Sequence, residues 1–138
     1  VDALAVRPAV VGSSWDLDRR DGQIAAWAQH AQVPVINMES ALWHPLQALA
    51  DLLTLRETYG TLAGKRLTLA WVHSPKPASV AVAHSLLTMA AAQGMQVRVA
   101  HPPGFELDEL VIQRAREGAK AAGGSLEFSH QLEAAVAG

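Results

Sequence analysis

The feature that most constrains this chain is an alternation that begins near residue 66. Short runs that are predicted to form strands are followed by segments with helical spacing. The runs are LTLAWV (67–72), MQVRVA (95–100) and SLEFS (125–129), and the helical segments are 80–93, 110–122 and one starting within 130–136. This alternation predicts βαβ units, and therefore an α/β fold with doubly wound parallel sheets and helices on both faces. Ligands of such sheets bind outside the carboxyl ends of the strands, at a topological switch point.

The first part of the chain contains the same kinds of element in a less regular order. We expect strands at 3–6 and 33–37, a polar loop at 12–22 and a short helix at 23–32. A β-branched run interrupted by Pro34 is typical of a strand start or of an edge strand. These residues therefore predict a second strand–helix–strand unit before the main alternation.

A longer helix is predicted from Pro45 to Tyr59. Proline is favourable at the first helical position, and Gly60 is a typical C-terminal stop. We expect its apolar surface to consist of Leu46, Leu49, Ala50, Leu53 and Leu55. That surface would hold two parts of the chain together.

Composition excludes several classes of protein. The 138 residues are 50% hydrophobic and carry a net charge of -2, so a packed core is expected and a basic nucleic-acid-binding surface is not. There is no cysteine, and the six histidines lack the spacing of a metal site. No apolar run approaches the roughly 20 residues that cross a bilayer. The sequence starts without Met inside an apparent strand, and we expect a central piece of a longer chain.

The motif HPLQ at 44–47 is the first candidate for chemistry. His44 precedes the long helix and Gln47 lies in its first turn, where free backbone N–H groups and the helix dipole favour anions. A neutral His donates one hydrogen bond to a polarised oxygen, and a Gln amide oxygen accepts from an amine. The pair suits a small ligand with both a carbonyl and an amine group. On spacing alone, a His and a Gln that simply cap a helix are the better explanation of the motif.

Three segments together resemble the aspartate and ornithine carbamoyltransferase family. They are VPVIN…HPLQALADLLTLRE, the preceding VDALAVR, and VAHSLL in the second half. In that family the matching Arg, His and Gln bind carbamoyl phosphate. The resemblance implies that Arg7 and His44 bind the carbamoyl oxygen or the adjoining phosphate oxygens, and that Gln47 binds the carbamoyl amide. The transfer would need no metal, cofactor or covalent intermediate.

The acceptor branch is indicated by the loop after the strand at 67–72. The sequence WVHSPKPAS, and the Glu of NMES, resemble the N-acetylornithine and N-succinylornithine carbamoyltransferases rather than ornithine carbamoyltransferase. The resemblance implies acceptor-binding roles for Glu39, Lys76 and Ser79. Glu39 lies one residue further from His44 than in that branch, and Ser79 replaces an expected Asn, so the acceptor stays open. Glu39 as a helix-entry acid and Lys76 as an exposed loop cation are the alternatives.

Other polar and aromatic residues are interpreted as structural. We expect His84 to be a satisfied helix residue that packs near the sheet, and Trp43 and Trp71 to pack in the core or at a hinge.

The resemblance also implies an organisation in two domains. We expect residues 1–43 to end a carbamoyl-phosphate domain, 44–60 to form an interdomain helix, and 61–138 to form most of an acceptor domain. Family members carry a Ser-x-Arg-Thr-Arg loop and a His-Cys-Leu-Pro-type loop, neither of which is present here, so we expect the 138 residues alone not to turn over. A homotrimer in the cytoplasm, working in arginine biosynthesis, is implied. The alternatives are ornithine carbamoyltransferase and a non-catalytic binding module.

Overall fold

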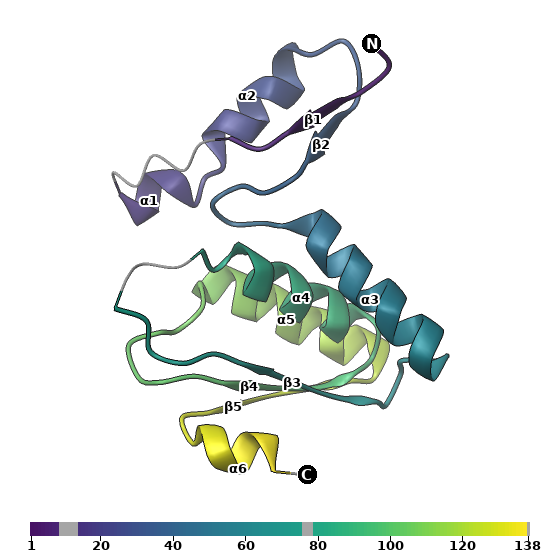
Figure 1. Ribbon diagram of the computed structural model, residues 1–138, viewed down its shortest axis with the longest axis vertical. Helices are drawn as coiled ribbons and strands as arrows, with labels where there is room; N and C mark the ends of the chain where they lie inside the picture. Colours follow the sequence, from purple (N-terminus) through teal and green to yellow (C-terminus); the bar gives the residue numbers. More distant parts are fainter. Residues whose placement is uncertain (9–13, 76–78, 138) are drawn as a thin grey trace.

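The computed structural model describes residues 1–8, 14–75 and 79–137 (Figure 1). Parallel strands and helices alternate along the chain, which confirms the predicted α/β class. A smaller unit contains the first two strands, a larger unit contains the other three, and helix α3 (Pro45–Tyr59) runs between them.

The smaller unit pairs β1 (Leu4–Val6) with β2 (Val35–Asn37) in parallel. Because the register sets Val6 against Asn37, the residues that follow the two strands leave the sheet at the same edge. Helix α2 (Gly22–His30) connects the strands and contacts β2. The predicted short helix is thus confirmed, with slightly earlier bounds.

The polar loop expected at 12–22 was wrong for part of its length. Residues Trp15–Asp18 form the short helix α1. The backbone carbonyl of Ser14 accepts hydrogen bonds from the N–H groups of Leu17 and Asp18. The turn of α1 is stabilised by tertiary contact, because the indole of Trp15 donates a hydrogen bond of 3.2 Å to Asp108 in the other unit. A contact across 93 residues leaves no periodic signal in the local sequence.

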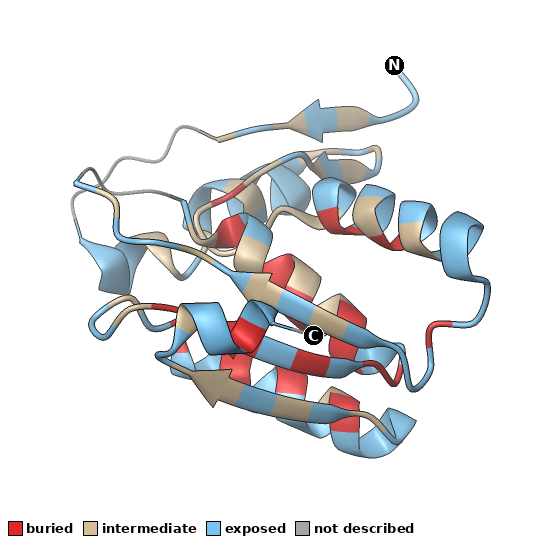
Figure 2. Ribbon diagram, turned by 60° about the horizontal axis from the view of Figure 1, so that its bottom comes forward, coloured by how far each residue is buried: buried red, intermediate tan, exposed pale blue. Residues whose placement is uncertain are grey.

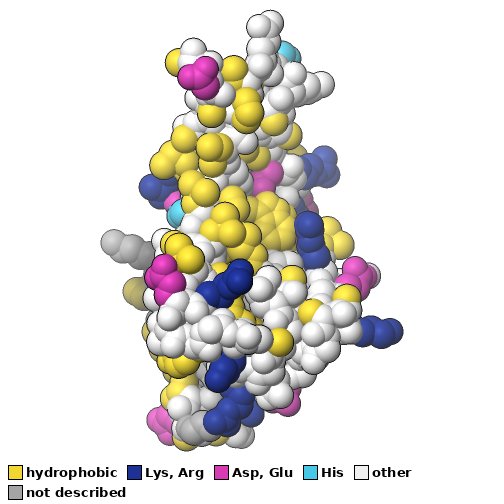
Figure 3. Space-filling model, turned by 90° about the vertical axis from the view of Figure 1, so that its right-hand side faces the viewer, with side chains coloured by type: hydrophobic (Ala, Val, Ile, Leu, Met, Phe, Trp, Pro, Cys, Tyr) yellow, Lys and Arg dark blue, Asp and Glu magenta, His cyan; other side chains and the backbone are white. Residues whose placement is uncertain are grey.

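Helix α3 has the bounds predicted for it, but the face predicted to be buried is wrong. Ala48 and Leu52 are buried where α3 packs on α4 (Ala81–Ala92), and only Leu55 of the predicted set packs against the core. The remaining leucines of that set are 42–57% exposed, namely Leu46, Leu49 and Leu53. Figure 3 shows hydrophobic side chains gathered on the side of the molecule where α3 lies. The helix has two apolar stripes, and close packing on α4 selects the one that contains the small Ala48.

The larger unit is a parallel sheet in the order β3 (Arg66–Ala70), β4 (Gln96–Ala100) and β5 (Ser125–Ser129). Helices α4 and α5 (Glu109–Ala122) cover one face, and α6 (Leu132–Val136) lies against the other (Figure 1). Helices on both faces were predicted, and the strand and helix bounds fall within two residues of the predicted ones.

The core lies between this sheet and α4 and α5. Its fully buried side chains include Leu87, Met95, Val97, Val99 and Val111. Figure 2 marks the buried positions in red along the ribbon. The many alanines of α4 let it approach both neighbouring helices closely. Gly94 ends the α4 turn at φ +72°, and a Cβ there would stand 2.6 Å from the carbonyl oxygen of Ala122, so a side chain does not fit.

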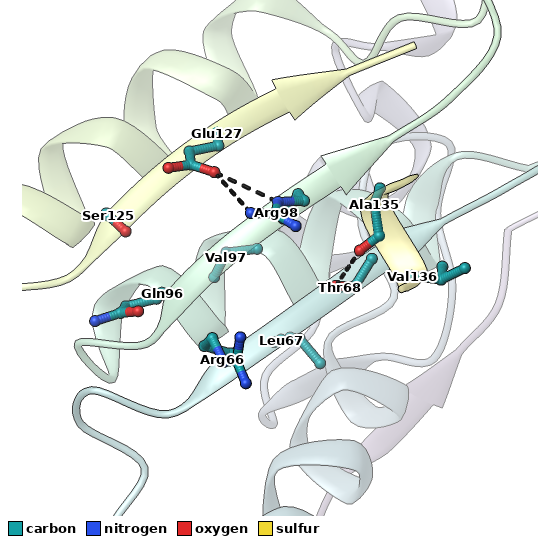
Figure 4. Close-up of a pocket in the computed structure, with 10 residues that line it drawn as sticks. All are labelled: Arg66, Leu67, Thr68, Gln96, Val97, Arg98, Ser125, Glu127, Ala135 and Val136. Carbon is teal, nitrogen blue, oxygen red and sulfur yellow. Dashed lines mark hydrogen bonds and ion pairs between the residues drawn. The ribbon is translucent and has the colours of Figure 1, made fainter. Parts of the chain in front are cut away.

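The outer face of the same sheet is polar. Arg98 of β4 pairs with Glu127 of β5 at 3.4 Å, and Thr68 donates a hydrogen bond to the backbone of Ala135 in α6 (Figure 4). These residues line a pocket of about 120 Å³. Since the Arg98 and Glu127 side chains are 45% and 65% exposed, this pair contributes little to stability.

Candidate functional site

Three predicted site residues meet at the carboxyl edge of the smaller sheet. Arg7 follows β1, Glu39 follows β2, and His44 precedes α3. The Arg7 guanidinium lies 2.5 Å from Oε2 of Glu39, and Nε2 of His44 lies 4.0 Å from the same oxygen. The structure therefore gathers a cation, an acid and an imidazole where one helix begins.

The three side chains differ in how far they are exposed to solvent. The Arg7 side chain is 69% exposed, while Glu39 and His44 are 14% and 23% exposed. Within the described residues, Nδ1 of His44 is buried and has no hydrogen-bond partner. An unpartnered buried nitrogen beside a helix N-terminus costs free energy unless a ligand or water satisfies it.

The loop between β2 and α3 is fixed by a buried serine. Ser40 is 1% exposed, and its hydroxyl donates to Asp21 at 2.8 Å and accepts from the amide of Asn37 at 2.9 Å. The other Asp21 oxygen accepts from the backbone N–H of Leu42. Asp21 itself has φ +50°, a conformation that Asp tolerates better than most residues. Glu39 thus lies on a loop whose backbone is held by Asp21, the residue that precedes α2.

His44 is also anchored to the larger unit. Its backbone N–H donates a hydrogen bond of 2.8 Å to the Ser85 hydroxyl of α4. The backbone of His44 thus belongs to the loop of the smaller unit and is hydrogen-bonded to the larger unit, which fixes the position of the imidazole. Sequence reasoning missed Ser40, Asp21 and Ser85, because their partners lie 19 to 41 residues away and no local pattern connects them.

Gln47 does not join this cluster directly. Its amide Nε2 donates a hydrogen bond of 2.9 Å to Oδ1 of Asp51, one turn further along α3, and both side chains reach solvent. The predicted contact with a carbamoyl amide stays a prediction.

Of the two acceptor-binding residues predicted in the larger unit, the structure describes Ser79 alone. Ser79 lies beside the start of α4, and its hydroxyl accepts a hydrogen bond of 3.3 Å from the N–H of Ala81. Lys76 lies outside the described residues. A role in acceptor binding stays a prediction for both.

His84 is satisfied, as expected, but it packs against the smaller unit rather than the sheet. Its Nδ1 donates to the carbonyl of Leu42 at 3.1 Å, and its Nε2 accepts from the N–H of Asp108 at 3.1 Å. The rings of Trp15 and Trp43 lie 6.3 and 6.4 Å from the imidazole. Burial lowers the pKa of His84, and the Leu42 carbonyl and nearby Asp108 oppose that effect. A neutral imidazole therefore joins the two units.

The two tryptophans expected to pack in the core or at a hinge do so. Trp43 contacts His84 at the junction, and the Arg114 guanidinium stands 5.6 Å from its ring. Trp71 packs against the main core, stacks on His101 at 5.1 Å and donates to the carbonyl of Phe105.

Across the ranges 1–8, 14–75 and 79–137 there is no group of three potential metal ligands. Within those ranges, no helix has the length and apolarity to cross a membrane.

Comparison with known proteins identifies the family. Residues 1–57 match the model of the aspartate/ornithine carbamoyltransferase carbamoyl-P binding domain, and residues 65–138 match the Asp/Orn binding domain of the same family. This chain belongs to the aspartate/ornithine carbamoyltransferase family. The resemblance inferred from Arg7, HPLQ and the flanking segments is thereby confirmed.

Relatives within the family differ in their acceptor. The N-acetylornithine carbamoyltransferase of Xanthomonas campestris pv. campestris is 42% identical over all of this chain and 41% of its own length. The ornithine carbamoyltransferase of a Parafrankia species is 43% identical over all of this chain and 38% of its own length. Identity alone therefore does not separate the two acceptors. The chain spans about 41% of the length of the first curated relative it matches.

Solved carbamoyltransferase structures share the fold. A crystal structure of acetylornithine transcarbamylase complexed with acetylcitrulline superposes with a TM-score of 0.94 at 41% identity, over 100% of this chain and 42% of that one. An N-acetyl-L-ornithine transcarbamylase mutant complexed with carbamyl phosphate and N-succinyl-L-norvaline matches equally well.

Proposed function

We propose that the complete protein to which these residues belong transfers the carbamoyl group of carbamoyl phosphate to the side-chain amine of an N-acylated ornithine. N-acetylornithine is the preferred acceptor, and the reaction would serve arginine biosynthesis. The observation that carries this proposal is the meeting of Arg7, Glu39 and His44 at the start of α3. Family membership supports the donor.

The donor half of the reaction needs anion binding and oxyanion stabilisation. The guanidinium of Arg7 keeps N–H donors beyond the one used by Glu39, and α3 contributes the free N–H groups and dipole of its first turn. A neutral His44 carries one N–H, on either ring nitrogen, and can donate it to the carbamoyl oxygen. The His44 side chain is 23% exposed, and its Nε2 lies 4.0 Å from the Glu39 carboxylate, so this edge of the ring faces the cluster.

The transfer step follows from these positions. The neutral acceptor amine attacks the carbamoyl carbon and forms the new C–N bond while negative charge develops on the carbamoyl oxygen. The C–O bond to phosphate then breaks, and the leaving phosphate takes up the proton that the amine loses. Donors that already point at the oxygen stabilise that charge without reorganising. Fixing two substrates side by side supplies much of the remaining rate enhancement. Gln47 would accept a hydrogen bond from the carbamoyl amine.

The acceptor assignment has support from the sequence of the loop at 71–79 and from Glu39. The carboxylate of Glu39 pairs with Arg7 at the cluster, and in this proposal it binds the amine or amide end of the acceptor. Lys76 and Ser79 complete the proposed acceptor set. A homotrimeric assembly and a cytoplasmic location are further parts of the proposal, which the family resemblance implies.

A substrate panel tests the proposal. The complete protein is assayed with carbamoyl phosphate and, in parallel, N-acetylornithine, N-succinylornithine, ornithine and aspartate. The highest kcat/KM is expected with N-acetylornithine. Preference for free ornithine, the second candidate supported by the Parafrankia relative, would contradict the acceptor assignment. Absence of transfer to any acceptor would favour a non-catalytic binding module.

The 138-residue chain provides a separate test. It has the Arg7 and His44 cluster but no Ser-x-Arg-Thr-Arg motif, so we expect it to bind phosphate weakly and not to turn over. Product formation by the isolated chain would contradict this part of the proposal.

A further inference from the structure

The hydrogen bond between Gln47 and Asp51 has a direction. The amide Nε2 of Gln47 donates to Oδ1 of Asp51 at 2.9 Å. A carboxylate accepts hydrogen bonds and donates none, so it selects the nitrogen of the amide and repels the oxygen. The amide is planar, and fixing Nε2 toward Asp51 therefore places Oε1 on its other branch, away from the carboxylate.

This orientation matters because Gln47 lies in the first turn of α3, directly after the His44 that belongs to the candidate site. His44 is the residue that precedes α3, Gln47 follows it by three residues, and Asp51 lies one turn beyond Gln47, where the two side chains meet. His44 in turn lies near Glu39 and Arg7. The Gln47–Asp51 pair thus lies on the helix that begins at the candidate site.

We propose that Asp51 is a positioning residue that makes Gln47 present a hydrogen-bond acceptor to the carbamoyl amine. The inference rests on the proposed function, because it needs Gln47 to contact that amine. Without Asp51 the amide would rotate freely, and in half of its orientations an NH₂ group would face the NH₂ of the ligand. Asp51 itself would not touch the substrate.

Simple electrostatics predicts the opposite result, which makes the inference testable. Asp51 is an acid on the helix that carries the phosphate site, so its removal would strengthen the binding of an anion through Coulomb attraction alone. Removal would also favour the helix, since Ala has a higher helix propensity than Asp. A weaker interaction with carbamoyl phosphate after Asp51→Ala would therefore come neither from charge nor from helix loss.

The experiment uses steady-state kinetics of the complete protein with carbamoyl phosphate, and acetyl phosphate as a competing ligand in which a methyl group replaces the amine. Asp51→Ala should raise the KM for carbamoyl phosphate roughly three- to tenfold, the effect of one hydrogen bond. It should leave the inhibition constant of acetyl phosphate unchanged or lower. Asp51→Glu keeps a carboxylate, so its KM for carbamoyl phosphate should stay close to the wild-type value. Glu57→Gln, which removes an exposed acid from the far end of α3, is the matched control and should change neither value.

A double variant separates this inference from the proposed function. If Asp51 acts through Gln47, adding Asp51→Ala to Gln47→Ala should not raise the KM further. A further rise in the double variant, or an equal loss of acetyl phosphate inhibition in the single variant, would overturn the positioning role while leaving the proposed function intact. An unchanged KM in Gln47→Ala would remove the proposed contact of Gln47, and the role of Asp51 with it. Melting temperatures of all variants should match the wild type.

Discussion

Arg19 donates a hydrogen bond of 2.9 Å to the carboxylate of Asp108, which lies 89 residues later and has a side chain that is 3% exposed. The same carboxylate accepts from the indole of Trp15 and caps α5 through the N–H of Leu110. One buried acid thus ties the first helix of the smaller unit to the start of a helix in the larger unit.

Replacement of Asp108 is therefore expected to be costly. Asp108→Ala removes a helix cap and leaves the partly buried guanidinium of Arg19 without its anion, so the free energy of unfolding should fall by about 2–4 kcal/mol. Urea denaturation measures the change. Asp16→Ala, an exposed acid of α1, is the control and should stay within about 0.5 kcal/mol. Equal losses in the two variants would contradict a specific role for Asp108.

The neutral His84 at the same junction predicts a pH dependence. Because burial lowers its pKa in the folded state, the unfolded state binds the proton first as the pH falls below about 6.5. Stability should thus be complete above that pH and should decrease as the pH falls toward the lower folded-state pKa. The urea midpoint, followed from neutral to mildly acidic pH, should fall less in His84→Gln than in the wild type. Parallel pH curves for the two proteins would show that His84 does not cause the loss.

The pairing of Glu39 with Arg7 predicts competition with the donor substrate. The Glu39 carboxylate occupies one side of the Arg7 guanidinium, the group that phosphate would also use. Glu39→Gln removes a negative charge beside that position, and we expect inorganic phosphate to bind roughly three- to tenfold more tightly, as measured by calorimetry. KM for the acceptor should rise at the same time. Glu57→Gln serves again as the control, and weaker phosphate binding by Glu39→Gln would refute the competition.

Two adjacent leucines of α3 test which face is buried. Leu52 is 8% exposed in the contact with α4, whereas Leu53 is 57% exposed. Leu52→Ala should lower the free energy of unfolding of the 138-residue chain by about 2–4 kcal/mol, and Leu53→Ala by well under 1 kcal/mol. The two substitutions are chemically identical and lie one residue apart. The reverse order would restore the face expected from periodicity.

Much of the fold was predictable because its signals are local. The bounds of α3 follow from Pro45 and Gly60, and those of β5 follow from a five-residue alternation of polar and apolar residues before His130. The buried face of α3 was not predictable in the same way, because both Leu52 and Leu53 fit an apolar stripe and only the partner helix decides between them. Helix α1 was missed because Trp15 forms its stabilising contact with a residue in the other unit.

The candidate site shows the same division. The family resemblance pointed to Arg7, Glu39 and His44, and the structure brings these three together. The groups that hold them in place were not visible in the sequence, since Ser40 meets Asp21, and His44 meets Ser85, only after folding. Hydrogen bonds between distant residues follow no periodicity, and only the folded chain reveals them.

The hydrogen bond between Ser40 and Asp21 fixes the backbone of the loop that carries Glu39 without involving the Glu39 side chain. The path of the loop is determined by groups that lie outside the ligand cluster, while the side chain at position 39 faces that cluster. Such a segment can exchange the side chain at this position during evolution without displacing His44. A change of acceptor preference could then arise through single substitutions at this position, with the backbone path of the loop left in place.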